Sequence, residues 1–173
     1  MIGINPVIVV PDIDENTLPG EKVEDFLKRV TIAKGEAIYN SSYFHDPVIS
    51  SDTIVLCENR VIGKPSSRDE AYEFMKLLSN NKHEVLTGVA IRYEGQVYYD
   101  YARTGVTFSE ISEEELLYYL EHEEYMDKAG AYAIQGKASV YIQEINGCFF
   151  NVMGFPLNLF YGMLKKIGIV LYK

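Results

Sequence analysis

The sequence lacks the features that mark several large classes of protein. No apolar run approaches the ~20 residues that a membrane-spanning helix needs. The opening residues MIGINPVIVVPDIDE carry neither a basic segment nor a small-residue cleavage site, so a secretory signal peptide is not expected. Repeats and low-complexity segments are also missing. We therefore expect a single globular domain spanning residues 1–173, with no membrane partner.

Cysteine is scarce, with only Cys57 and Cys148 in the chain. Neither lies in a CxxC pair or at a metal-ligand spacing from a histidine, so a structural zinc site is not expected. Two isolated cysteines are typical of reduced thiols in a cytoplasmic protein. Cytoplasm is the predicted compartment.

Basic residues are outnumbered, since 16 Lys and Arg face 25 Asp and Glu and give a formal net charge of −9. This balance argues against binding to a nucleic acid polymer or to an anionic membrane, which requires clustered basic residues. Phosphate-binding signatures rich in glycine, the GxGxxG and P-loop patterns, are also absent. A local phosphate pocket remains compatible with the composition.

The apolar pattern predicts alternating strands and helices. Residues 7–10, VIVV, predict a short buried strand that ends at Pro11, and the spacing over 22–40 predicts a helix with one apolar face. Further along, the pattern predicts a strand, tight turn and return strand within 48–65, then a helix after the capping box Ser67/Glu70. It also predicts a long hairpin (83–108) that turns at 94–96, a helix after the capping box Ser112/Glu115, a strand (140–145) and a last helix near Pro156. This order predicts an α/β fold with a mixed sheet.

Polar residues at the ends of these elements are candidates for a site. In the acidic loop, Glu15 follows Asp12 and Asp14, and a calcium-binding EF-hand is excluded because Thr17 stands where that loop requires glycine. Asp52 interrupts an apolar strand. Either it lies on the solvent-exposed face of an edge strand or its charge has a function, and the sequence leaves both interpretations open.

Two lysines are candidates to bind phosphate. Lys64 projects from a turn that Gly63 and Pro65 stiffen, and Lys34 lies on the first predicted helix beside Gly35, whose small size suits close packing. A single lysine on a helix is more often simply solvated. Carboxylates and lysines on separate elements nevertheless suit one chemistry, in which oxygen ligands hold Mg²⁺ or Mn²⁺ and lysines neutralise phosphate oxygens.

A segment rich in small residues, YMDKAGAYAIQGKASVYI at 125–142, combines Gly and Ala with a few polar side chains. It suits a wall that a ligand approaches closely, because small residues leave the backbone accessible. A tight connection between a helix and a strand explains the composition equally well. The residues alone do not decide between the two.

The motifs "DIDE", "SSDTIV", "IGKP", "HEVLTGVA", "DKAGAYAIQG" and "NVMGFP" occur in the order and at the spacing of the Maf family, which the chain resembles over essentially its whole length. The resemblance implies an elongated α/β fold, similar to the inosine triphosphatase fold, with a mixed sheet, flanking helices and a cleft between two lobes. It also implies hydrolysis of a nucleoside triphosphate to the monophosphate and pyrophosphate with a divalent cation, Mg²⁺ or Mn²⁺. The nucleotide is the expected partner, and homodimer formation is left open.

The resemblance also implies roles for single residues. The catalytic set is Asp52, Glu15, Lys34 and Lys64, of which Glu15 and Asp52 hold the metal; Gln135, Thr53, Lys64 and Lys34 bind substrate. Thr53 directly after Asp52 resembles the subgroup that prefers dTTP and UTP.

One family motif, "SxSPRR", is not found in the sequence, and the chain is therefore expected to be truncated at its N-terminus relative to the family. The five arginines lie in other contexts: Arg29, Arg60, Arg68, Arg92 and Arg103. An alternative function follows, in which a catalytically impaired nucleotide-binding protein regulates cell division through a partner.

Overall fold

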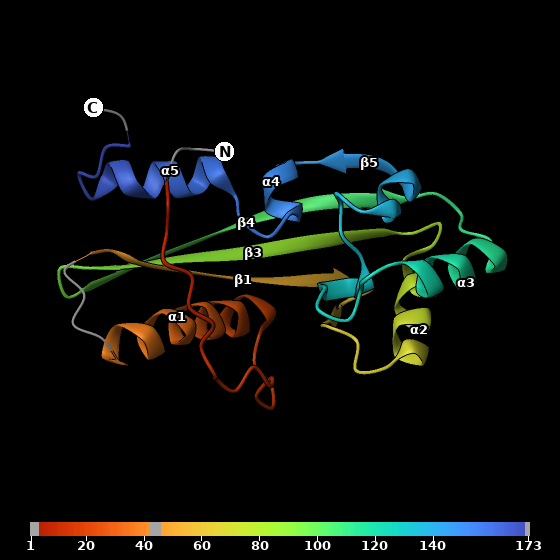
Figure 1. Ribbon diagram of the computed structural model, residues 1–173, viewed down its shortest axis with the longest axis horizontal. Coiled ribbons are helices and arrows are strands. Elements are labelled where there is room, and N and C mark those ends of the chain that lie inside the picture. The colour runs from red at the N-terminus through yellow and green to blue at the C-terminus, as the bar shows by residue number, and fades with distance from the viewer. Residues whose placement is uncertain (1–3, 42–45, 172–173) are drawn as a thin grey trace.

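The computed structural model of the chain describes residues 4–41 and 46–171. Its elements in chain order are α1 (Val23–Ser41), β1 (Val48–Cys57), β2 (Arg60–Ile62), α2 (Arg68–Leu78), β3 (Lys82–Tyr93), β4 (Gln96–Phe108), α3 (Glu113–His122), the 3₁₀ turns η1 (Ala129–Ala131) and η2 (Lys137–Tyr141), β5 (Ile142–Asn146), α4 (Phe149–Val152) and α5 (Leu157–Lys166). Figure 1 shows an elongated molecule in which helices flank one sheet. The predicted combination of helices and one sheet is confirmed, but the sheet of the described residues is antiparallel and not mixed as expected.

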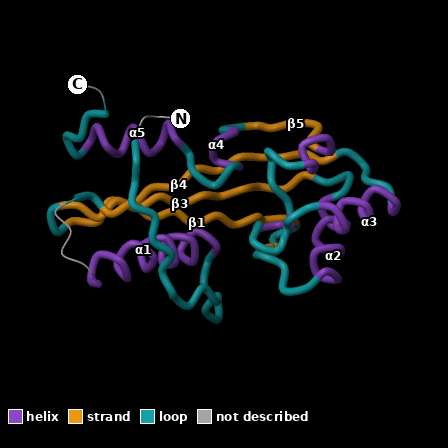
Figure 2. Tube along the Cα trace, in the orientation of Figure 1, coloured by secondary structure: helices purple, strands orange, loops and turns teal. Residues whose placement is uncertain are grey.

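The sheet of the described residues has five strands in the order β2-β1-β3-β4-β5, and each neighbouring pair is antiparallel. β3 and β4 form the predicted long hairpin, which runs the length of the molecule (Figure 2). Glu94 and Gly95 form its two-residue turn, and their positive φ angles of 48° and 78° are those of a tight turn that matches the twist of the strands.

Helices cover both faces of the sheet. On one face, Phe26, Leu27 and Val30 of α1 pack on the strands through Ile54 and Leu86. On the other face, α5 packs on β3, and the two helices lie on opposite sides of the sheet in Figure 1. The predicted amphipathic helix at 22–40 is therefore confirmed, because its apolar face forms part of the core.

Helices α2 and α3 close one end of the sheet over a third apolar cluster. The capping box at α3 is complete, since Ser112 and Glu115 each bind the other's backbone N–H. The box at α2 is only half formed. Ser67 accepts the N–H of Glu70, but the Glu70 carboxylate binds the backbone N–H and hydroxyl of Ser66.

Two strand predictions need correction. Residues 7–10 are not a buried strand: they have no regular structure, and Val7, Ile8 and Val10 are more than four-fifths exposed. The VIVV composition favours a strand, but a strand exists only where a neighbour pairs with it, and none in the described residues does. The strand predicted at 140–145 begins only at Ile142, because the preceding residues form η2.

The helices of the described ranges include none with the length and hydropathy that crossing a membrane requires.

Candidate active site

A cleft of about 510 Å³ lies beside β1 and has the size of a small-molecule site. Its walls are the middle of β1, the turn after β2, the segment 127–136 and residues 152–154 that follow α4. The polar and charged side chains of its lining are Lys34, Ser51, Asp52, Thr53, Lys64, Asp127, Lys128, Tyr132 and Gln135. Five of the six sequence-predicted site residues therefore line one cavity, although they come from four separate stretches of chain.

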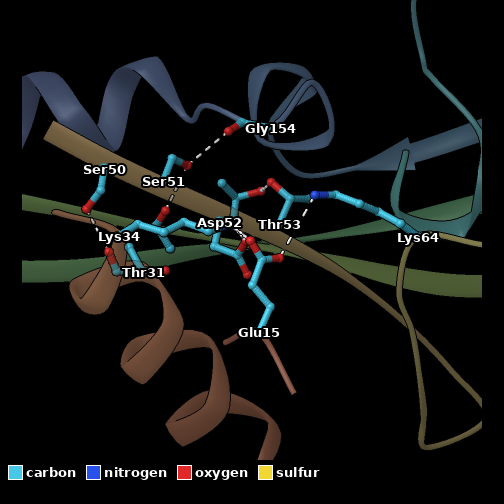
Figure 3. A network of polar contacts seen from close by, with 11 residues as sticks. Glu15, Thr31, Lys34, Ser50, Ser51, Asp52, Thr53, Lys64 and Gly154 are labelled. Atoms are coloured by element: carbon cyan, nitrogen blue, oxygen red, sulfur yellow. Dashed lines mark hydrogen bonds and ion pairs between the residues drawn. The ribbon is translucent and has the colours of Figure 1, made fainter. Parts of the chain in front are cut away.

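The closest charged contact in this cleft joins α1 to β1. Lys34 Nζ lies 2.5 Å from Asp52 Oδ1 and 2.9 Å from Glu15 Oε1 (Figure 3). Glu15, from the irregular segment before α1, thus reaches the same ammonium as Asp52 without lining the cleft itself. Two carboxylates and one lysine that are distant in sequence converge on one position.

Close packing of α1 on β1 makes this convergence possible. A Cβ on Gly35 would lie 2.8 Å from Ser50 Oγ, so only glycine lets the helix approach at this point. The Ser50 hydroxyl in turn donates to the Thr31 carbonyl at 2.7 Å. The expectation that Gly35 serves close packing is confirmed. Lys34 directly precedes Gly35, so the same close approach brings its side chain to β1.

Alternation along β1 directs successive side chains to opposite faces of the sheet. Asp52 faces α1, where it meets Lys34, whereas Ser51 and Thr53 face the residues around α4. The Ser51 hydroxyl lies within donating distance of the Gly88 and Gly154 carbonyls, at 2.9 and 3.0 Å. The cleft therefore opens around the edge of β1 and includes groups from both of its faces.

Burial and the neighbouring opposite charge shift the pKa of each member of the Lys34–Asp52 ion pair in opposite directions. Burial raises the pKa of the Asp52 carboxyl above its ordinary value, and the neighbouring Lys34 offsets this only in part. Burial alone would lower the pKa of Lys34, but the hydrogen bonds that its ammonium donates to Asp52 and Glu15, together with their negative charges, outweigh burial and raise that pKa. Lys34 is thus a permanent cation, and Asp52 is a more basic carboxylate than an exposed aspartate.

Lys64 approaches the same centre from the opposite wall. Its Nζ lies 3.9 Å from Glu15 Oε2, and its side chain is more than half exposed. The turn that carries it is held by a hydrogen bond from the Gly130 N–H to the Gly63 carbonyl, at 3.0 Å. Gly130 has a φ of 72°, which favours glycine, and a Cβ there would crowd Val55. The "GKP" and "DKAG" motifs are therefore physically joined.

The small-residue segment is a wall of the cleft, as one of the two sequence readings proposed. Ala129, Ala133 and Gly136 line the cavity, and the exposed Gln135 lies among them. Asp127 and Lys128 form an ion pair of 2.6 Å at the same wall. The wall therefore offers one amide and one further lysine between stretches of accessible backbone.

The carboxylates of the cleft suit a cation that the substrate also binds. Among the described residues, no group of three or more His, Cys, Asp or Glu side chains could enclose a metal ion. Glu15 and Asp52 nevertheless place two oxygens on one cationic centre, now the ammonium of Lys34. Mg²⁺ commonly takes one or two carboxylates together with substrate phosphates and waters, so this donor set fits such an ion.

Arginine is absent from the lining of the cleft in the described part of the chain. Three arginines instead pair with glutamates elsewhere: Arg29 with Glu21, Arg92 with Glu36, and Arg103 with both Glu24 and Glu84. Among the described residues, the basic side chains that line the cavity are therefore all lysines.

Sequence reasoning assigned no role to several residues of the cleft. Met153 and Gly154 line it, and Gly154 has a φ of 95°. Behind them, the buried Asn151 of α4 binds β3 and β4 through its side chain. The glycine of the "NVMGFP" motif was the available signal, because glycine marks positions where the backbone turns with a positive φ.

Comparison with known proteins places this sequence in a family. The family model described as Maf-like protein matches residues 1–167. A dTTP/UTP pyrophosphatase of Syntrophomonas wolfei is 39% identical over 171 residues, covering 96% of this chain and 89% of that protein. Proteins of the same name from Bacillus cereus strain AH187 and Bacillus anthracis strain CDC 684 are 40% and 38% identical, over 94% and 98% of this chain and 84% and 88% of their own lengths.

Proposed function

The chain belongs to the Maf family, and from this premise we propose that it is a nucleoside triphosphate pyrophosphatase that acts on dTTP and UTP. The relatives described above carry that activity in their names. The observation that supports the proposal most directly is the convergence of Lys34, Asp52 and Glu15 beside a nucleotide-sized cleft. The products are the nucleoside monophosphate and pyrophosphate.

Asp52 is the residue we assign as general base. Its Oδ1 is engaged by Lys34, so Oδ2 is the oxygen that accepts a proton from the attacking water. The water oxygen forms a bond to the α-phosphorus, and the bond from that phosphorus to the oxygen bridging the α- and β-phosphates breaks. Burial supports this role, because it raises the pKa of Asp52 and makes the carboxylate more basic.

Lys34 and Lys64 supply positive charge where the leaving pyrophosphate develops negative charge. Both ammonium groups are within 4 Å of Glu15, so they border the same small volume from α1 and from the turn after β2. Fixed charges that are already in place before the reaction stabilise its transition state without reorganisation. Lys128 adds a third ammonium at the small-residue wall.

A divalent cation, Mg²⁺ or Mn²⁺, is part of the proposal, with Glu15 and Asp52 as its protein ligands. When bound, such an ion would neutralise phosphate charge. Glu15 is suited to this role because its carboxylate is only partly buried and is held by two lysines rather than by the core.

The pyrimidine base of the nucleotide is assigned to Gln135 of the small-residue wall and to Thr53 of β1. Gln135 is exposed within the cavity and can donate and accept hydrogen bonds through its amide. Thr53 lines the cleft on the α4 side of β1. These two side chains are the proposed contacts for thymine or uracil.

The test is a substrate screen with purified protein in the presence of Mg²⁺ or Mn²⁺ and with EDTA as the control. We expect pyrophosphate release from dTTP and UTP, slow turnover of ATP and GTP, and no turnover in EDTA. Orthophosphate as the first product would overturn the reaction, and equal use of purine nucleotides would overturn the substrate preference.

The alternative, nucleotide binding without efficient turnover, is favoured by one observation. The part of the cleft that the structure describes has no arginine, and arginine binds phosphate through two parallel hydrogen bonds whereas lysine acts as a point charge. Titration of α,β-imido-dTTP distinguishes the two functions. Tight binding without pyrophosphate release from dTTP would favour the alternative.

A further inference from the structure

Thr53, the cleft residue next to Asp52, begins a chain of hydrogen bonds that leads into the core. Its Oγ1 lies 3.0 Å from Thr87 Oγ1, and Thr87 Oγ1 lies 2.9 Å from the carbonyl oxygen of Asn151. Thr87 is fully buried and does not line the cavity. Thr53 is thus the only one of these three groups that lines the cleft in the described part of the chain.

The direction of this chain follows from the chemistry of its last member. A carbonyl oxygen only accepts hydrogen bonds, so the Thr87 hydroxyl donates its single proton to Asn151. Thr87 must then act as acceptor toward Thr53, and the Thr53 hydroxyl therefore donates its own proton to Thr87. With that proton committed, Thr53 Oγ1 offers only lone pairs to a ligand.

The acceptor at the end of the chain is fixed in place. The side-chain amide of Asn151 donates to the Val85 carbonyl at 2.9 Å and to Thr104 Oγ1 at 3.0 Å, which ties α4 to β3 and β4. Asn151 and Thr87 are both fully buried, so neither the Asn151 carbonyl nor the Thr87 hydroxyl can turn toward water instead. The orientation of the Thr53 proton is accordingly a property of the fold.

Uracil and thymine differ from cytosine at N3, where the first two carry an N–H donor and cytosine carries an acceptor. Gln135 does not separate them, because its amide can present either a donor or an acceptor. A hydroxyl that can only accept does distinguish these bases. It accepts a hydrogen bond from the N3–H of uracil or thymine, whereas its lone pair repels the lone pair on N3 of cytosine. Guanine, which also has a ring N–H, is not distinguished by this contact.

We propose that Thr87, oriented by the Asn151 carbonyl, is a positioning residue that makes Thr53 an obligate acceptor and so selects uracil and thymine over cytosine. This inference rests on the proposed function, since it concerns the base of the same nucleotide. An unsatisfied or opposed polar group in a desolvated site costs enough to lower affinity about 10- to 100-fold. We expect preference for UTP over CTP in that range.

The decisive variant is Thr87→Val, which keeps the shape of the side chain and removes its hydroxyl. The Thr53 proton is then free to turn toward the cleft, so kcat/KM for CTP should rise about tenfold while that for UTP changes little. Thr87→Ser keeps the hydroxyl and should restore the wild-type ratio. A general loss of packing would lower both values together, so a gain for CTP is specific to the proposed orientation.

Two further measurements cover the case in which Thr87→Val does not fold. Thr53→Val removes the acceptor itself and should lower kcat/KM for UTP to the level of CTP. The wild-type protein should discriminate against N3-methyl-UTP as strongly as against CTP, because the methyl group replaces the N–H. Equal use of UTP and N3-methyl-UTP, or a folded Thr87→Val with an unchanged ratio, would overturn the inference.

Failure of the proposed function gives a different result. If no triphosphate releases pyrophosphate, the same comparison is made by calorimetric titration of α,β-imido-UTP and α,β-imido-CTP into each variant. A preference for the uracil analogue that Thr87→Val abolishes would support the inference without catalysis. Equal affinities in the wild-type protein would reject it.

Discussion

Lys34 Nζ lies 2.5 Å from Asp52 Oδ1, and this contact joins helix α1 to strand β1 beside the cleft. Both side chains are largely buried, with exposed fractions of 15% and 11%. Removing one partner of such a pair leaves a charge with reduced solvation, which is usually destabilising. Here Glu15 provides a second carboxylate for Lys34, so loss of Asp52 does not leave the ammonium unpaired.

Asp52→Asn is therefore expected to separate activity from stability. The variant keeps an oxygen that can accept from Lys34 but loses the basicity that a proton acceptor needs, so pyrophosphate release should fall roughly 10²–10⁴-fold. Its melting temperature should stay within a few degrees of the wild type. Asp100→Asn, the same change at a residue of β4 outside the cleft, is the matched control and should keep full activity. Near-normal activity of Asp52→Asn would make Asp52 a structural residue only.

Lys64→Met is expected to act mainly on binding. Lys64 is more than half exposed, and within the described residues it makes a single long ion pair, to Glu15, so removing its charge should change the free energy of unfolding by less than about 0.5 kcal/mol. Loss of one charge-assisted phosphate contact should weaken binding of α,β-imido-dTTP about 10- to 100-fold. Lys166→Met, on the exposed end of α5, controls for net charge. Equal weakening in both variants would indicate a general electrostatic effect.

The sequence predicted those parts of the structure that depend on neighbouring residues. Apolar spacing located α1, the turn residues at 94–96 located the β3–β4 hairpin, and Ser112 with Glu115 located the start of α3. Each of these signals acts within a few residues. The strand predicted for the VIVV segment was wrong because that prediction also used only local composition. Its β-branched composition is local, whereas strand pairing is not, and Pro6 and Pro11 on either side contribute no N–H.

The geometry of the site lay beyond what such patterns contain. Single residues could be carried over from a family resemblance, but nothing in the sequence showed that Glu15 and Asp52 meet on one lysine. The hydrogen-bond chain from Thr53 through Thr87 to α4 was equally invisible, because it depends on strand register and on a helix of four residues. Buried polar contacts between distant segments are set by tertiary packing.

His83 links stability to pH. Burial lowers its pKa to about 4 from an ordinary value of 6.5, and its Nε2 lies 2.7 Å from the Tyr132 hydroxyl. The folded state thus keeps His83 neutral, while the unfolded chain binds a proton below pH 6.5. The stabilisation is complete above pH 6.5, declines as the pH falls toward 4, and changes no further below that value.

His83→Gln removes this titration and retains a partner for Tyr132. Urea unfolding at pH 7 and pH 4.5 should show that the wild type loses about 2–3 kcal/mol more than the variant over this interval. His122→Gln, at an exposed histidine of α3, should follow the wild type. Parallel curves for wild type and His83→Gln would show that His83 is protonated with equal ease in both states.

Gly35 and Gly162 offer a matched test of why α1 lies so close to β1. Both glycines are inside helices, where replacement by alanine normally stabilises by ~1 kcal/mol. Gly162 has no heavy atom within 4 Å of the new Cβ, so Gly162→Ala should show that gain. Gly35→Ala brings its Cβ to 2.8 Å from Ser50 Oγ and should instead destabilise by ~1–2 kcal/mol in urea unfolding.

The Ser50→Ala background identifies the contact responsible. Without the hydroxyl, the nearest atom to the new Cβ is the Cβ of residue 50 at 3.4 Å, an ordinary contact, and Gly35→Ala should then be neutral or stabilising. The two changes should therefore couple by about 1 kcal/mol or more in a double-mutant cycle. Because Lys34 adjoins Gly35, the single variant should also lose kcat/KM for dTTP as α1 shifts, and Ser50→Ala should recover part of it. Additive effects on stability would mean that Gly35 is not what brings Lys34 within reach of Asp52.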